Sequence, residues 1–211
     1  MRYISRKGER DVFHTVMIGK GGIMKKTDTD EQLFRSFLCG DHDSFNELME
    51  RYGDRVTRYI GGRIADQQEA EDLMIEAFSR VIIAEPDFIS EGTFRAYLFK
   101  TARTVAIRFN KGYRLHHHFG LEDYSAELIG GEDHLEGMVH EEQNRIILNC
   151  MDQLKPDYRE ALYLRYYENM NLQQIGVVMR KNRKAVENLL GRGRNMLGTL
   201  LKQEGIDSNR Y

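Results

Sequence analysis

The stretch NLQQIGVVMRKNRKAVENLLGRGRNMLGTLL, residues 171–201, predicts two helices joined by a tight basic turn. Asn171 and Gln174 have the spacing of a capping box, in which each side chain satisfies a free backbone amide of the first turn. A second cap follows at Asn182. The apolar residues that recur at helical spacing and are expected to face the core are Leu172, Ile175, Val178, Met179, Val186, Leu189, Leu190, Met196, Leu197 and Leu200.

The charge of this stretch is strongly basic around the turn. Its cations are Arg180, Lys181, Arg183, Lys184, Arg192 and Arg194, with Lys202 directly after it, against the single acid Glu187. A short helix, a tight turn and a second helix with basic and amide groups in its first two turns are typical of a helix-turn-helix, whose second helix lies in the major groove of DNA. The alternative is a helical hairpin with a solvated basic face. The concentration of cations at the turn favours DNA binding.

Length and composition set the limits for the rest of the chain. The 211 residues carry a net charge of −2, so any nucleic-acid binding must come from local basic patches. Cys39 and Cys150 lie far apart, which indicates free buried thiols in a reducing compartment and no paired metal spacing. No apolar run approaches the ~20 residues of a membrane span. We therefore expect a cytoplasmic, all-α protein.

The first half of the chain predicts four helices. The first follows Asp28 or Thr29, and the second opens at Asp43 or Ser44. Asp66 and Glu69 have a spacing like that of a capping box and are expected to start the third helix. The chain stops being helical at Pro86. The residues expected to be buried in the first and third helices are Leu33, Phe34, Phe37, Leu38, Ala70, Leu73, Ala77, Phe78, Val81 and Ile82.

The fourth helix, residues 93–111, combines cations with aromatic side chains. Arg95, Lys100 and Arg103 are expected on its outer face, with Tyr97 and Phe99 interleaved. Single-stranded nucleic acid needs such a surface, because bases stack on rings while phosphates meet the charges. The alternative is that both aromatic residues belong to the core.

The pattern divides the chain into two small helical domains joined by a flexible linker. Residues 1–27 are interpreted as a tail, either disordered or the product of an early start assignment, and residues 28–113 as the first domain. Residues 114–137 are interpreted as an acidic linker, residues 138–203 as the second domain and residues 204–211 as a tail. Three adjacent histidines, His116–His118, lack partners for a metal site.

Four segments in order resemble the extracytoplasmic-function sigma factors, the smallest members of the bacterial RNA polymerase sigma-70 family. They are AEDLMIEAF (70–78), TFRAYLFKTARTVAI (93–107), LKPDYREALYLRYYENMNLQQIG (154–176) and KAVENLLGRGRNML (184–197). The resemblance covers roughly residues 29–202 apart from the linker. It implies two helical domains, called regions 2 and 4, and no catalytic chemistry.

The resemblance implies a role for each basic or acidic helix. The third helix matches the segment that docks on the largest polymerase subunit, through Asp72, Leu73, Glu76, Ala77 and Phe78. The alternative is that these acids only solvate an outer face. The fourth helix matches the segment that opens the minus-ten promoter element, through Arg95, Tyr97, Lys100, Arg103 and Thr104. The family often has Trp, Asn and Asp at the positions of Tyr97, Thr104 and Arg108. These differences bear on which base the helix prefers and not on its electrostatic attraction for the strand.

The second helix of the helix-turn-helix matches the reader of the minus-thirty-five element. The expected contacts with duplex DNA come from Arg180, Lys181, Arg183, Lys184, Glu187, Asn188 and Arg192. Glu187 is suited to accept from cytosine N4 and Asn188 to pair with adenine, while the cations hold phosphates. Gln174 and Gly176 replace a commoner Glu and Ala, from which we expect little consequence.

The expected partners are core RNA polymerase, promoter DNA and an anti-sigma protein, with no cofactor and no metal. A first alternative is a stand-alone helix-turn-helix regulator that uses residues 28–113 as a sensor or dimerisation domain. A second is a small nucleic-acid-modifying enzyme, but the sequence lacks a paired-carboxylate, Cys-His or phosphate-loop arrangement at useful spacing.

Overall fold

The computed structural model describes residues 28–64, 66–88, 90–117 and 146–205, and all regular structure in these ranges is helical. The elements are α2 (Asp30–Leu38), α3 (His42–Gly61), the 3-10 turn η1 (Gln67–Glu69), α4 (Ala70–Ala84), α5 (Thr93–His117), α7 (Pro156–Tyr166), α8 (Leu172–Met179) and α9 (Arg183–Gln203). Residues 146–152 are helical as well. The predicted all-α class is confirmed. The expectations for residues 1–27, for most of the linker, for the start of the second domain and for 206–211 lie outside the described residues.

Short-range signals set most helix starts. Thr29 and Gln32 form a capping box at α2, and Asn171 and Gln174 form the predicted one at α8. The side chain of Asn182 accepts from the backbone N–H of Ala185 and so caps α9, again as predicted. Pro156 begins α7, where its missing N–H costs no helical hydrogen bond. These caps depend on residues two to three positions apart.

Other boundaries differ from the predicted ones. Asp41, not Asp43 or Ser44, caps α3. No side chain caps α4, because Asp66 accepts from Gln68 and a 3-10 turn intervenes before the α-helix. α5 continues to His117, so the first residues assigned to the linker are helical.

Helices α2 to α5 bury a largely aromatic core. Its rings include Phe34, Phe45, Phe78, Phe94 and Phe99, none more than 2% exposed. Contacts between rings run from α2 to the loop before α5, as between Phe34 and Phe88 with centroids 5.3 Å apart. α4 packs against both α3 and α5. The core therefore holds α4 and α5 side by side.

Some residues expected in the core lie outside it. Leu38 at the end of α2 is 44% exposed, Met196 on α9 is 48% exposed, and Ile82 is only half-buried. Cys39 is exposed, whereas Cys150 is buried as expected. Met196 lies beside the buried line of α9, which runs through Val186, Leu190, Gly193 and Leu201. A helical period predicts a stripe but not its edges, because the neighbouring element decides how far the stripe extends.

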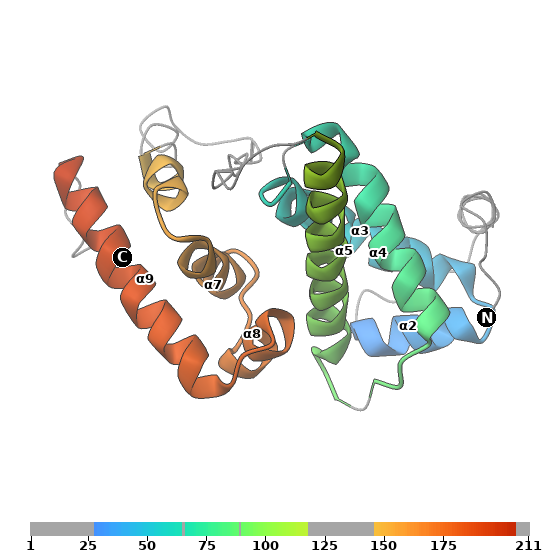
Figure 1. Cartoon of the computed structure of the whole chain (residues 1–211). Coiled ribbons are helices and arrows are strands. Elements are labelled where there is room, and N and C mark those ends of the chain that lie inside the picture. The colour runs from blue at the N-terminus through green and yellow to red at the C-terminus, as the bar shows by residue number, and fades with distance from the viewer. Residues whose placement is uncertain (1–27, 65, 89, 118–145, 206–211) are drawn as a thin grey trace, which may run out of the picture.

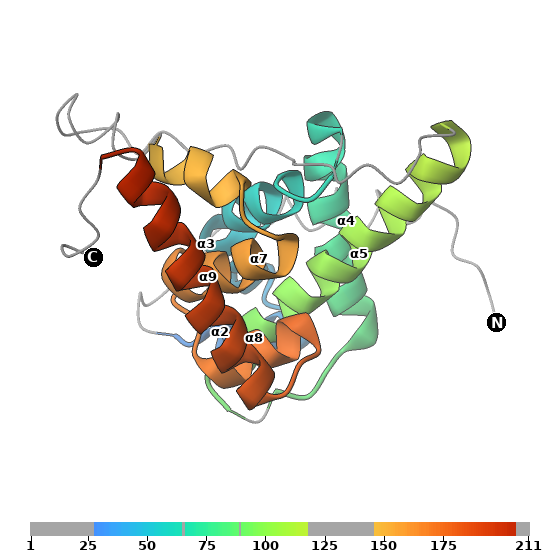
Figure 2. The ribbon, with the colours of Figure 1, turned by 60° about the vertical axis from the view of Figure 1, so that its left-hand side comes forward.

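The C-terminal helices pack directly on the first set. α7 and α9 pack against each other, and α8 packs against α9 and α5, as the two views show together (Figures 1 and 2). Buried residues from both sets form one continuous apolar cluster. The two predicted helical domains are therefore in contact, and the face of α5 that was expected to lie outside is partly covered by α8. Among the described residues, no helix has the length and apolar character to cross a membrane.

Candidate nucleic-acid interface

The turn between α8 and α9 has a tightly constrained backbone. Arg180 ends α8 in the left-handed region with φ 54°, and the N–H of Lys181 donates to the carbonyl of Gly176 at 3.0 Å. A Cβ added at Gly176 would lie 2.7 Å from the carbonyl oxygen of Lys181. The expectation that Gly176 has little consequence is therefore wrong, because alanine there collides with the backbone of the turn.

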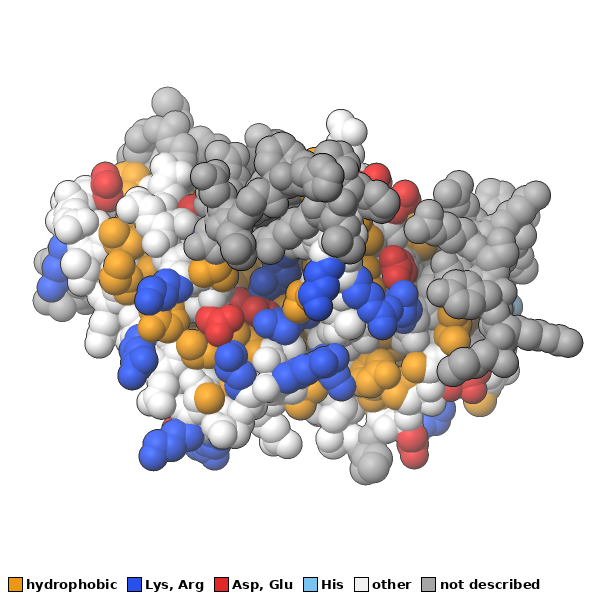
Figure 3. All heavy atoms as spheres, in the orientation of Figure 1, with side chains coloured by type: hydrophobic (Ala, Val, Ile, Leu, Met, Phe, Trp, Pro, Cys, Tyr) orange, Lys and Arg blue, Asp and Glu red, His pale blue; other side chains and the backbone are white. Residues whose placement is uncertain are grey.

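The predicted duplex contacts divide into two groups. Arg183, Lys184, Glu187, Asn188 and Arg192 are exposed along the start of α9. Arg183, with its side chain 77% exposed, pairs with Glu187 at 2.9 Å within the helix. Arg180 and Lys181, the two cations of the turn, contact neighbouring helices instead. Lys181 pairs with Asp157 of α7 at 3.1 Å, and Arg180 donates to Thr104 of α5 at 3.5 Å. Figure 3 shows Lys and Arg side chains gathered over α8, the start of α9 and α5.

The predicted single-strand contacts lie on α5, but three of the five touch the second helical set. Arg95 donates to Gln174 at 3.3 Å, Arg103 donates to Glu160 at 3.0 Å, and Thr104 accepts from Arg180. Tyr97 and Lys100 remain half-exposed, with the ammonium 5.5 Å from the ring centroid. Phe99 is fully buried, so for this residue the core interpretation was right.

The capping glutamine of α8 also has a role that spacing did not reveal. Gln174 donates to the carbonyl of Gly92, just before α5, at 3.0 Å and accepts from Arg95. Gly92 has φ 78°, and a Cβ there would lie 2.3 Å from the Gln174 amide nitrogen. Gln174 thus joins the two sets of helices, which contradicts the expectation of little consequence.

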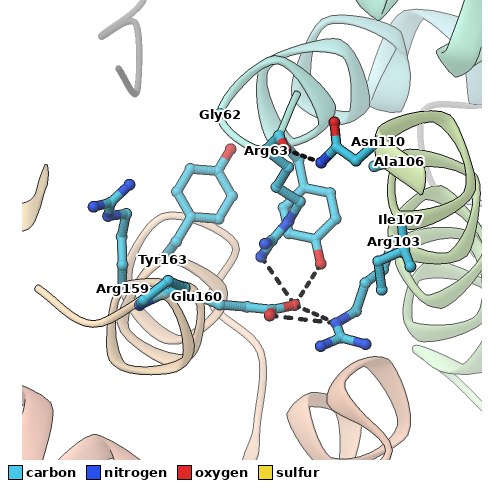
Figure 4. Close-up of a pocket in the computed structure, with 11 residues that line it drawn as sticks. Gly62, Arg63, Arg103, Ala106, Ile107, Asn110, Arg159, Glu160 and Tyr163 are labelled. Carbon is cyan, nitrogen blue, oxygen red and sulfur yellow. Dashed lines mark hydrogen bonds and ion pairs between the residues drawn. The ribbon is translucent and has the colours of Figure 1, made fainter. Parts of the chain in front are cut away.

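A buried carboxylate, Glu160 of α7, lies between the two sets (Figure 4). Its side chain is 3% exposed and accepts from Tyr59 at 2.8 Å and from Arg103 at 3.0 Å. Arg63 forms an ion pair with the same carboxylate at 2.9 Å, and its guanidinium lies 4.3 Å from the Tyr59 ring centroid. These residues line a cavity of about 160 Å³. A second ion pair, Arg55 to the buried Glu168 at 2.6 Å, spans the same interface.

Neither Glu160 nor its partners Tyr59 and Arg63 were predicted from the sequence, and Arg103 was predicted only as a nucleic-acid contact. The only local signal was an acid beside the apolar residues 161–164 of α7. Burial, which disfavours the phenolate, raises the pKa of Tyr59 well above its usual value, and the charge of Glu160 raises it further. Burial alone would lower the pKa of Arg63, but Tyr59 and Glu160 raise it above its usual value. The cluster therefore holds a neutral phenol between charged partners.

This raised pKa predicts alkaline destabilisation. The native state keeps the Tyr59 proton while an unfolded tyrosine loses it near pH 10, so stability present below pH ~10 falls as pH rises above it. Each such group contributes a slope of about 1.4 kcal/mol per pH unit. Tyr59→Phe removes one titrating group. The free energy of unfolding of this variant should therefore fall less steeply than that of the parent between about pH 10 and 11. Urea unfolding at each pH measures this, with the exposed Tyr166→Phe as control.

The predicted polymerase-docking set also divides. Asp72 is exposed and Glu76, half-exposed, pairs with Arg80 at 2.6 Å. Leu73, Ala77 and Phe78 are 6%, 0% and 1% exposed, so they belong to the core and offer no surface to a partner. The apolar residues of α4 that reach the surface are the half-buried Met74 and Ile75 and the 61% exposed Ile83.

Two family models match the chain, Sigma-70 region 2 over residues 48–114 and Sigma-70, region 4 over residues 144–197, together more than half of its length. The chain belongs to the sigma-70 family of RNA polymerase sigma factors, in its extracytoplasmic-function group. Sigma factors are non-enzymatic initiation factors. The family places the chain among promoter-specific initiation factors that bind RNA polymerase and does not favour a stand-alone regulator.

Two relatives are similar to the sigma factor over most of its length. It is 28% identical over 178 residues to the ECF RNA polymerase sigma factor BldN of Streptomyces coelicolor, covering 82% of this chain and 66% of that protein. It is 26% identical over 171 residues to SigW of Bacillus subtilis, covering 77% of this chain and 91% of that protein.

Two solved structures share the fold of the sigma factor. CnrH in complex with the cytosolic domain of CnrY has a TM-score of 0.58 at 22% identity and covers 83% of this chain and 99% of that one. RpoE in complex with the anti-sigma factor NepR from Bartonella quintana has a TM-score of 0.58 at 15% identity and covers 75% of this chain and 96% of that one.

Proposed function

We propose that the chain binds core RNA polymerase, directs it to specific promoters and assists their melting through two separate cationic helices. Residues 28–113 act as region 2 and residues 138–203 as region 4. The observation that carries the proposal is that α9 begins with exposed cations beside Glu187 and Asn188, while α5 carries cations beside an accessible aromatic ring. The polymerase forms the phosphodiester bonds, so the chain needs no catalytic group, and the work takes place in the cytoplasm.

Region 4 binds the minus-thirty-five element as duplex. The start of α9 enters the major groove, where Arg183, Lys184 and Arg192 neutralise phosphates. Glu187 accepts from cytosine N4 and Asn188 pairs with adenine. Glu187 must leave its ion pair with Arg183 to do so, and an exposed pair of this kind is worth only about 0.3–0.5 kcal/mol. Base readout therefore competes with a weak contact.

Region 2 binds the melted minus-ten strand. Tyr97 offers a ring for an unstacked base, and Lys100 lies beside it to meet a phosphate. Arg95, Arg103 and Thr104 extend this surface along α5. On α4, Asp72 and Glu76 form the charged part of the polymerase-docking surface, with Met74 and Ile75 as its apolar part.

An anti-sigma protein is the proposed regulatory partner. The solved structures with this fold hold CnrH with the cytosolic domain of CnrY and RpoE with the anti-sigma factor NepR. A protein that covers α5 or α4 would block promoter or polymerase contacts directly.

Reconstitution with bacterial core RNA polymerase tests the function. We expect the chain to comigrate with the core enzyme and to yield promoter-dependent transcripts from fragments of the native genome. A stand-alone regulator would instead bind duplex DNA without polymerase and leave core transcription unchanged. Absence of both comigration and promoter-dependent transcripts would reject the sigma function.

A further inference from the structure

We propose that the buried carboxylate of Glu160 is a latch that holds the two helical domains closed and occupies the cationic face of α5 in place of a nucleic-acid phosphate. The closed chain binds single-stranded DNA weakly, and separation of the domains uncovers the face. This inference rests on the proposed role of α5 in contacting the melted strand.

The surroundings of Glu160 resemble those of a bound phosphate. Two guanidinium groups from the first domain, Arg63 of the loop after α3 and Arg103 of α5, meet the carboxylate at 2.9 and 3.0 Å, and the Tyr59 hydroxyl donates at 2.8 Å. Guanidinium binds carboxylate and phosphate oxygens with the same planar donor geometry. The three donors come from residues 57 to 101 positions away in sequence, so they surround Glu160 only when the domains are closed (Figure 4).

The rest of the interface covers the same face of α5. α8 packs against α5, and its Gln174 occupies one side of the Arg95 guanidinium. The Nε atom of Arg95 is buried and has no hydrogen-bond partner among the described residues. Thr104 is covered by Arg180 from the turn before α9. A DNA strand cannot follow α5 past these positions until α8 moves away.

The chemistry of the latch suits a reversible contact. The Glu160 carboxylate and its two arginines lose water when the interface closes, and this desolvation offsets much of their mutual attraction. Removal of the carboxylate alone leaves Arg63 and Arg103 partly buried without a counter-ion, which favours the open state, where water or phosphate reaches them. The Arg55–Glu168 pair at 2.6 Å is a second contact of the same kind, but it does not involve α5.

Two variants of the full chain test the latch. Glu160→Gln keeps the shape of the side chain and removes its charge, and Glu168→Gln breaks the second ion pair without touching α5. Glu50→Gln, an exposed position on α3, is the control for the same change in charge. A dye pair on the exposed Cys39 and on Thr199→Cys of α9 reports domain separation by energy transfer, since Cys150 is buried and protected. Thermal unfolding confirms that each variant is folded.

We expect lower energy transfer in Glu160→Gln and Glu168→Gln than in the parent or in Glu50→Gln. Affinity for a mixed-sequence single-stranded oligonucleotide should rise roughly fivefold, as expected when about one further phosphate is neutralised at 0.1 M salt. Should Glu160→Gln not fold, Glu168→Gln gives the same test alone.

Unchanged energy transfer in the folded variants would overturn the latch. Lower energy transfer without a gain in affinity for single-stranded DNA would overturn the inference that Glu160 occupies the place of a DNA phosphate. Neither result bears on initiation itself. A parent chain that yields no transcript with core polymerase would reject the proposed function whatever the dyes report.

Discussion

Phe78→Ala is expected to lower the free energy of unfolding by about 3–5 kcal/mol, because the substitution empties a filled part of the core. The ring is 1% exposed and meets Phe45 edge to face, with centroids 5.8 Å apart. Urea unfolding measures the loss, and any fall in polymerase binding should follow the folded fraction. A folded, stable Phe78→Ala chain that fails to bind polymerase would restore this residue to the docking surface.

Asp72→Lys provides the comparison on the outer face of the same helix. Its side chain is exposed, so the free energy of unfolding should change by no more than about 0.5 kcal/mol. Binding to core polymerase should nevertheless weaken, because the reversed charge opposes its proposed partner surface. Asp54→Lys, exposed on α3, controls for net charge. Equal affinity of Asp72→Lys and the parent for core polymerase would remove α4 acids from the docking surface.

The double variant Arg183→Ala, Lys184→Ala is expected to weaken duplex binding about 10- to 100-fold at 0.1 M salt, since two phosphates lose their cations. The slope of log affinity against log salt should become shallower by about 2, at 0.9 for each phosphate contact. Fluorescence anisotropy with a mixed-sequence duplex, from about 50 to about 200 mM salt, measures both quantities.

The matched control is Arg194→Ala with Lys202→Ala. These cations are also exposed on α9 but lie about three to five turns beyond Arg183 and Lys184 along the helix, away from the major groove. They should change the salt slope much less. Should the two double variants show the same slope, the start of α9 is not the duplex-binding surface.

Interactions between residues close in sequence could be predicted because they depend only on local spacing. The Asn171–Gln174 capping box, the Asn182 cap and Pro156 at the start of α7 all depend on positions within one helical turn. The exposed cations of α9 followed for the same reason, since the helical period separates the charged face from the buried one. These signals, with the resemblance they carried, were sufficient for the all-α class and for the family.

Interactions between distant segments were not predictable in this way. Leu73 and Phe78 were assigned to a docking surface, but α3 and α5 cover that side of α4. Gly176 was expected to be replaceable, yet the turn brings the carbonyl of Lys181 to 2.7 Å from its absent Cβ. In each case the neighbour that decides the outcome comes from another part of the backbone.

The sequence by itself determined which segments become helices, which faces are apolar and where the cations gather, because caps and helical periods act over three or four residues. Tertiary structure alone decided that α8 lies on α5 and that Glu160 takes Arg103, 57 residues away, as its partner. The physical reason is that a buried charge is stable only beside an opposite charge. Which residue supplies that charge depends on how distant helices pack, and the hydrophobic period of the sequence does not predict it.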